Sequence, residues 1–131
     1  LIGTNSAMLV SLILAIGIND LQFQFNINED IIKTELSNLI KQAKEKVKRI
    51  ILLSPPQIKD NILNSFFSSM FDKTSIEKSK NLANIHEKIP LENNIKFINL
   101  NEITAPSEID GLHYDENGHL KIAQEILKSI L

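Results

Sequence analysis

Asp110 and His113 lie three residues apart near the C-terminus, just before a stretch with helical periodicity. One short loop can therefore present both side chains at the same place. A carboxylate that accepts a hydrogen bond from imidazole Nδ1 fixes the tautomer and leaves Nε2 free to take a proton from a hydroxyl nucleophile. The spacing permits a general-base pair, although taken alone it is more typical of an ordinary Asp-Gly turn followed by a loop histidine.

A second polar cluster, Gly17 to Asp20, follows the apolar run at residues 8–16. Gly17 opens the end of that run, so the amide of Asn19 could point into a cleft. An amide N–H placed there can stabilise a tetrahedral oxyanion, which is worth roughly 3–4 kcal/mol in acyl transfer. Gly-x-Asn-Asp is also typical of a simple turn, and we expect Asp20 to brace the loop or cap a neighbouring segment.

Other kinds of chemistry find little support in the sequence. We expect His119, at the start of the terminal helix, to be structural, and His86, in mid-helix near Lys88, to be solvated. No metal site is predicted, because the chain has no cysteine and no pair of histidines at ligand spacing flanked by carboxylates. Gly17 and Gly118 lack the spacing of a phosphate-binding loop.

Three apolar runs predict the strands that must position these residues. They cover residues 8–16, 49–54 and 95–100, and the first of them is expected to be buried on both faces. Apolar stripes at i, i+3/i+4 spacing predict helices over 28–48, 74–89 and 120–130, with Pro90 ending the second helix. The order β-α-β-α-β-loop-α predicts an α/β fold with right-handed crossovers and a parallel sheet covered on both faces.

The polar clusters coincide with the ends of the predicted strands. In open parallel sheets, sites form beyond the carboxyl ends of the strands. Residues 17–20, 54–56 and 110–113 all fall there, one cluster after each strand. This shared location carries more weight than any single motif.

Local signals refine the helices and one long connection. Asn28 is predicted to be an N-cap, and Thr74 with Glu77 has capping-box spacing. The connecting segment, residues 57–72, mixes phenylalanines with polar residues. We expect these aromatic side chains to serve packing, and the alternative is a lid over a cleft.

Composition limits the classes of partner and compartment. The chain has 131 residues, enough for one domain with a core, and a formal net charge of -2 without a basic stripe, so nucleic acid is not an expected partner. The apolar run Ala7 to Ile18 is shorter than the ~20 residues of a membrane-spanning helix, and it lacks the basic flank of a secretory signal. A cytoplasmic location is expected, with export left open. Because Leu1 leads almost directly into an apolar run, we expect the sequence to be an excerpt of a longer chain.

Two stretches resemble sequence blocks of the SGNH (GDSL-type) hydrolases. The stretch Ala-Ile-Gly-Ile-Asn-Asp at 15–20 resembles the third block, and Asp-Gly-Leu-His-Tyr-Asp-Glu-Asn-Gly-His at 110–119 resembles the D-G-x-H-x-x-x-x-G-H pattern of the fifth in full. Residues 51–56, followed by 77–79 and an amphipathic helix, are similar to the arylesterase and acyl-thioesterase branch. The resemblance covers roughly residues 8–131.

The resemblance implies a flavodoxin-like three-layer α/β/α sandwich that hydrolyses carboxylic esters or thioesters without a cofactor. It implies that His113 is the general base, Asp110 its orienting partner and Asn19 an oxyanion-hole donor, supported by Gly17 and Asp20. Residues 1–131 would then be the C-terminal portion of a single domain, without the N-terminal strand or strands of the fold.

The family's Gly-Asp-Ser nucleophile block has no counterpart here. The cluster Gly3-Thr4-Asn5-Ser6 lies too close to Asn19 for the helix and strand that should separate them. We therefore expect an upstream segment, a second chain or another copy in a homo-oligomer to cover the strand at 8–16, and an upstream segment or second chain to supply the serine. The alternatives are a non-catalytic binding domain that has lost the nucleophile, and a receiver or nucleotide-binding domain, which would need acidic clusters or a phosphate loop that the sequence lacks.

Overall fold

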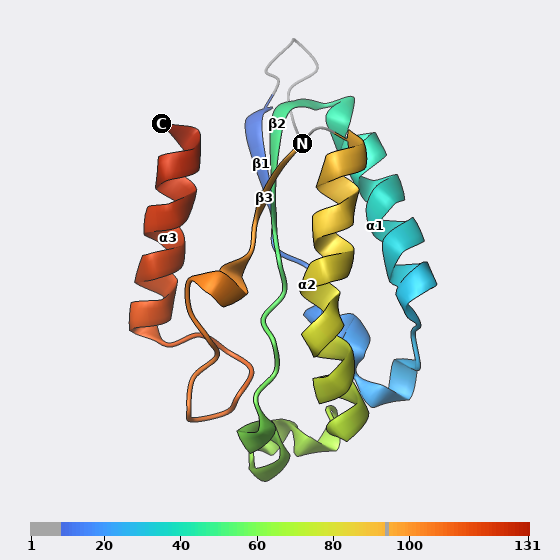
Figure 1. Cartoon of the computed structure of the whole chain (residues 1–131), viewed down its shortest axis with the longest axis vertical. Coiled ribbons are helices and arrows are strands. Elements are labelled where there is room, and N and C mark those ends of the chain that lie inside the picture. Colours follow the sequence, from blue (N-terminus) through green and yellow to red (C-terminus); the bar gives the residue numbers. More distant parts are fainter. Residues whose placement is uncertain (1–8, 94) are drawn as a thin grey trace.

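The computed structural model describes residues 9–93 and 95–131 as a three-layer α/β/α sandwich. Its parallel sheet has the order β1-β2-β3, formed by Leu9–Leu14, Val47–Leu53 and Lys96–Ile98. Helices α1 (Glu29–Lys44) and α2 (Lys73–Asn93) cover one face, and α3 (Glu116–Ile130) covers the other (Figure 1). The predicted α/β class and parallel sheet are confirmed.

The alternation of side chains along β2 builds the core on both faces of the sheet. Ile50 and Leu52 pack in one cluster with α1 residues, while Ile51 and Leu53 pack with Ile122 of α3. Successive side chains of a strand point to opposite faces, so a continuous apolar run is what a central strand requires.

Helix α1 begins as its sequence predicts. The side chain of Asn28 accepts a hydrogen bond from the N–H of Ile31 at 2.9 Å, which confirms it as the N-cap. Ile32, Leu36 and Ile40 form the buried stripe of this helix. Their spacing keeps them on one face of the helix. Leu36 and Ile40 pack against β2, while Ile32 packs in the cluster that contains Leu21.

Strand β1 differs from its prediction as a strand buried on both faces. Among the described strands β1 pairs only with β2, and the side chains of Val10 and Ile13 are 61% and 41% exposed. The described strand begins at Leu9, because residue 8 lies outside the described part of the chain. A run of apolar residues indicates a buried strand, but it does not identify the element that covers the strand.

Two local predictions for α2 are wrong. The helix continues through Pro90 to Asn93, because Ile89 and Pro90 are buried and tertiary packing outweighs the lost N–H donor. The carboxylate of Asp72, rather than Thr74, accepts a hydrogen bond from the N–H of Ser75, at 3.1 Å.

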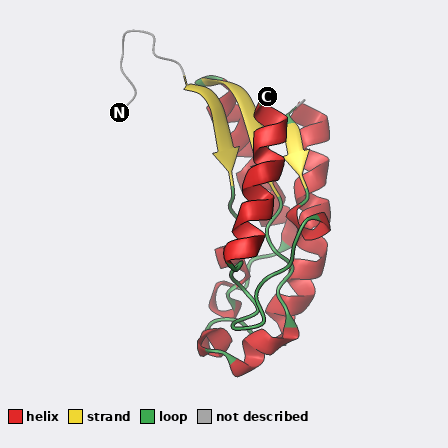
Figure 2. Cartoon of the chain, turned by 90° about the vertical axis from the view of Figure 1, so that its left-hand side faces the viewer, coloured by secondary structure: helices red, strands yellow, loops and turns green. Residues whose placement is uncertain are grey.

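The carboxyl ends of the strands lead to the end of the molecule where the functional candidates lie. Figure 2 shows the three strand arrows pointing the same way, toward the end where loops and short helices gather. These include 3-10 helices at Ile18–Leu21, Asp60–Asn64 and Phe66–Ser69. No helix within the described residues combines the length and apolar character needed to span a membrane.

Candidate active site

A cavity of about 280 Å³ lies at the carboxyl ends of β1 and β2. Asn19, Ser54 and His113 contribute to its wall from three segments that are distant in the sequence. The predicted meeting of the Asn19 and His113 loops at one sheet edge is therefore observed. Apolar side chains complete much of the lining, among them Ile16, Ile18, Leu100 and Leu112.

Asp110 and His113 form a hydrogen-bonded pair within one turn. Nδ1 of His113 lies 2.8 Å from Oδ2 of Asp110. Oδ1 of the same carboxylate accepts from the backbone N–H groups of Leu112 at 2.8 Å and His113 at 2.9 Å. Both oxygens are thus engaged, which leaves the carboxylate no freedom to turn away from the imidazole.

The electrostatics of the turn fix the direction of the His113 hydrogen bond. Partial burial raises the pKa of Asp110, but hydrogen bonds from the N–H groups of Leu112 and His113 and from the His113 ring outweigh it, so the net pKa lies below its usual value. An ionised carboxylate only accepts hydrogen bonds, so Nδ1 must donate and neutral His113 keeps its lone pair on Nε2. The His113 side chain is 62% exposed, so this nitrogen can meet an incoming proton donor.

Gly111 allows this turn to close against the connecting segment. Its φ of +72° is left-handed, and a Cβ there would lie 2.7 Å from Oδ1 of Asn61 and 2.9 Å from the backbone N of Ile62. Both the backbone angle and the close approach therefore require glycine between Asp110 and His113.

Substituting Gly111 with alanine should destabilise the chain by about 2–5 kcal/mol, because left-handed strain adds to a clash with backbone atoms. Urea unfolding monitored by circular dichroism measures this loss. The comparison is Gly118→Ala in α3, where the backbone is helical and an added Cβ would lie no closer than 3.2 Å to its neighbours, so the loss should be smaller than at Gly111. Equal losses in the two variants would contradict the close packing at Gly111.

Asn19 lies in the 3-10 helix that follows β1. Gly17, with φ +116°, makes the sharp turn into this helix, and the exposed side-chain amide of Asn19 has no hydrogen-bond partner among the described residues. The amide is therefore available to a ligand in the cavity. Asp20 does not join this wall, because it lines a neighbouring cavity on the α1 side.

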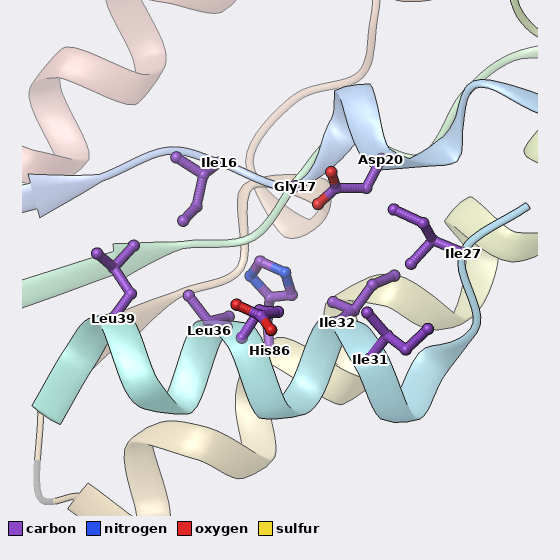
Figure 3. Close-up of a pocket in the computed structure, with 10 residues that line it drawn as sticks. Ile16, Gly17, Asp20, Ile27, Ile31, Ile32, Leu36, Leu39 and His86 are labelled. Carbon is purple, nitrogen blue, oxygen red and sulfur yellow. The ribbon is translucent and has the colours of Figure 1, made fainter. Parts of the chain in front are cut away.

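The neighbouring cavity, of about 400 Å³, shows that the prediction of a solvated His86 is wrong (Figure 3). His86 is 0% exposed, and neither ring nitrogen has a hydrogen-bond partner among the described residues. Its ring reaches Gly17, since a Cβ on that glycine would lie 3.1 Å from Nε2. Burial lowers the pKa of His86 to about 4. The spacing from Leu82 and to Ile89 places His86 on the apolar face of α2, a signal that its polar neighbours in sequence concealed.

Ser54 is the one serine in the wall of the cavity that holds Asn19 and His113. It is 2% exposed, its hydroxyl accepts from the N–H of Leu100 at 2.8 Å, and it donates to Oδ1 of Asn99 at 3.1 Å. These bonds tie the end of β2 to the loop after β3 and leave the hydroxyl no role as a nucleophile. Ser6, the other serine considered from the sequence, lies outside the described residues.

Two further aromatic residues of the cavity wall were not predicted to be part of the site. Tyr114 and His119 also line the cavity, and their ring centroids lie 6.0 Å apart. Burial raises the pKa of Tyr114 to about 12, and its hydroxyl has no partner among the described residues. His119 was predicted to be structural, yet it lies in the first turn of α3, at the cavity wall. Within the described residues no cluster of histidine and carboxylate side chains could hold a metal ion.

Comparison with known proteins shows which solved structures share this fold. No family model matches the sequence, and no curated protein is detectably similar to it. A carbohydrate acetylesterase family member from Sinorhizobium meliloti has a TM-score of 0.82 at 20% identity, over 95% of this chain and 61% of that chain. An aryl esterase from M. smegmatis has a TM-score of 0.77 at 19% identity, over 93% and 61%.

An acetylxylan esterase from Geobacillus stearothermophilus, solved as a catalytic mutant, has a TM-score of 0.69 at 23% identity, over 92% of this chain and 58% of that chain. This chain therefore spans about three-fifths of the length of these esterases. Between 92% and 95% of this chain is covered by its match to these three structures. The chain thus has the fold of the SGNH-type hydrolases over the part of that fold that it spans.

Proposed function

We propose that this chain supplies the general base, its orienting carboxylate and an oxyanion donor to a serine hydrolase acting on carboxylic esters or thioesters. The observation that carries the proposal is the 2.8 Å contact between Nδ1 of His113 and Oδ2 of Asp110, at the rim of a cavity that Asn19 also lines. Similarity in fold to esterases supports the same reaction class.

The arrangement suits acyl transfer through an enzyme-bound ester. Nε2 of His113 takes the proton of the attacking serine hydroxyl, and Asp110 stabilises the imidazolium that forms. The amide of Asn19 donates to the oxyanion of the tetrahedral intermediate. His113 then returns the proton to the departing alcohol or thiol, and water repeats the cycle to release the acid. This sequence needs no cofactor.

The open edge of β1 supports the proposal that the serine comes from elsewhere. Val10, Ile13 and Ile16 are exposed along or just after this strand. An apolar edge strand with unpaired backbone groups is a template for another strand, so proteins normally cover it. We propose that an upstream segment of the natural protein, or a second chain, pairs with β1 and brings the nucleophile to the rim of the cavity.

Replacing Asn19 with alanine in the protein that carries this serine should lower kcat for p-nitrophenyl acetate about 100- to 1,000-fold, because one oxyanion donor is lost. KM should change little, since the hydrogen bond strengthens only as charge develops on the substrate oxygen. Steady-state kinetics measure both constants. Asn38→Ala, exposed on α1, is the matched control and should keep wild-type kinetics.

The same assay separates the proposal from its main rival. If the protein with its upstream segment neither hydrolyses p-nitrophenyl acetate nor reacts with a serine-directed fluorophosphonate, the esterase proposal fails and a non-catalytic binding domain remains. If Asn19→Ala leaves turnover unchanged, that result contradicts the oxyanion role of Asn19 and leaves the rest of the esterase proposal standing.

A further inference from the structure

We propose that the connecting segment between β2 and α2 (residues 57–72) is a fixed brace for the Asp-His loop (residues 107–113), with Asn61 and Phe67 as positioning residues for His113. The kinetic consequences of this inference rest on the proposed esterase function. Its spectroscopic consequences do not.

Hydrogen bonds join the two segments at several points. Nδ2 of Asn61 donates to the carbonyl of Glu108 at 2.8 Å and approaches that of Ser107 at 3.5 Å. The N–H of Lys59 donates to the carbonyl of Gly111 at 2.9 Å, and its ammonium group pairs with the Glu108 carboxylate. The brace thus contacts the Asp-His loop on both sides of Asp110.

Apolar packing makes the same connection inside the molecule. Leu112, between Gly111 and His113, is buried in one cluster with Ile58 and Ile62 of the connecting segment. Phe71, 1% exposed, anchors the far end of the segment in that cluster. A displacement of the segment would therefore pull Leu112 out of the core, or leave a cavity beside it.

Phe67 extends the brace to the imidazole itself. The ring centroids of Phe67 and His113 lie 5.1 Å apart, with their planes tilted by 56°. The backbone N–H of Phe67 donates to the hydroxyl of Ser65, and its carbonyl accepts from the N–H groups of Met70 and Phe71. The Phe67 side chain also packs against the buried cluster that contains Ile62 and Leu112. A ring held by this packing limits rotation of the imidazole, which would otherwise break the bond between Nδ1 and Asp110.

These contacts distinguish a brace from a lid. A lid opens at low cost because it makes few buried contacts, whereas Ile58, Ile62 and Phe71 of this segment lie in one buried cluster with Leu112. Opening here would break the Asn61 and Lys59 hydrogen bonds and separate Ile62 from Leu112. The same movement would release Gly111, whose backbone lies against the segment.

The first test monitors the hydrogen bond between His113 and Asp110 by NMR in the 131-residue chain. The His113 signals are identified by their loss in His113→Ala. Wild type should show a low-field Nδ1 proton and nitrogen shifts of the Nδ1–H tautomer. In Asn61→Asp, which removes the donor without changing size, that proton should exchange with water about tenfold faster. Phe67→Leu should have the same effect, and the exposed control Asn64→Ala should leave the signal unchanged.

The second test uses the protein that carries its upstream serine. Asn61→Asp and Phe67→Leu should lower kcat about 10- to 100-fold with little change in KM, because they disturb alignment of the general base and not binding. An unchanged Nδ1 proton signal in both folded variants would overturn the brace, whatever the activity. A raised kcat in the two variants, together with fast hydrogen exchange of the Lys59 amide in wild type, would identify the segment as a lid. That result would also overturn the proposed brace. Absence of turnover in wild type would count against the esterase proposal only.

Discussion

Alanine in place of His113 should reduce kcat for p-nitrophenyl acetate about 1,000- to 10,000-fold in the protein that carries its upstream serine. The general base that accepts the serine proton is lost, and no described side chain in the cavity wall stands in the same relation to a carboxylate. KM should stay near its wild-type value, because the imidazole contributes to the transition state more than to substrate binding. Gln124→Ala, exposed on α3, is the control and should keep full activity.

Asp110→Asn should lower kcat about 10,000-fold, which is the upper end of the range expected for His113→Ala, although the turn can still form. An amide in place of the carboxylate can donate to Nδ1, which moves the imidazole proton to Nε2 and removes the base. Unchanged turnover in both variants would refute the proposed reaction. Unchanged turnover in the His113 variant alone would contradict its assignment as the base, and in the Asp110 variant alone the orienting role of that carboxylate.

The largest pH effect on stability should come from His86. Its pKa falls from 6.5 in the unfolded chain to about 4 in the fold, so the folded state binds fewer protons between these values. The free energy of unfolding should therefore be fully present above pH 6.5 and fall by about 3 kcal/mol as the pH drops to 4. Urea unfolding at pH 7.5, 6, 5 and 4 measures this slope.

His86→Leu removes the titrating ring, so the free energy of unfolding should change little between pH 6.5 and 4. The stability of the variant relative to wild type should therefore rise as the pH falls. Asn84→Ala, exposed on the same helix, should keep the wild-type slope. Asp110 and Asp72 have lowered pKa values, and their contributions are lost only below the usual carboxyl pKa of 3.8, outside this window. A wild-type slope in His86→Leu would show that the ring is not the buried neutral group of the fold.

The sequence patterns predicted the fold and the Asp-His loop because both depend on residues that are close in sequence. The apolar run of β2 and the stripe of α1 report burial directly, and Asn28 marks a helix start within three residues of its partner. Asp110 and His113 are equally close in sequence, so their pairing follows from one turn. The shared location of Asn19 and His113 in one cavity wall could be predicted because the carboxyl ends of parallel strands lie at the same edge of a sheet.

The features that sequence reasoning missed depend on contacts between distant segments. The exposure of β1 is set by the absence of a second neighbour among the described strands, which its own residues do not reveal. His86 is buried and its ring lies beside Gly17, which comes from a distant part of the chain. Asn61 reads as an ordinary polar loop residue until its amide is seen bonded to a loop 46 and 47 residues away.

The closure of the Asp-His loop also bears on the order in which the molecule assembles. The N–H of Ser107 donates to the carbonyl of His113 at 2.7 Å, and the N–H of Gly111 donates to the carbonyl of Ser107 at 3.0 Å, so the loop is closed by its own backbone. Contacts of such low contact order cost little loop-closure entropy and can form early in folding. Under the proposed function, this polypeptide would organise the acid-base half of the site before the serine arrives, and docking of the nucleophile would be the step that starts the chemistry.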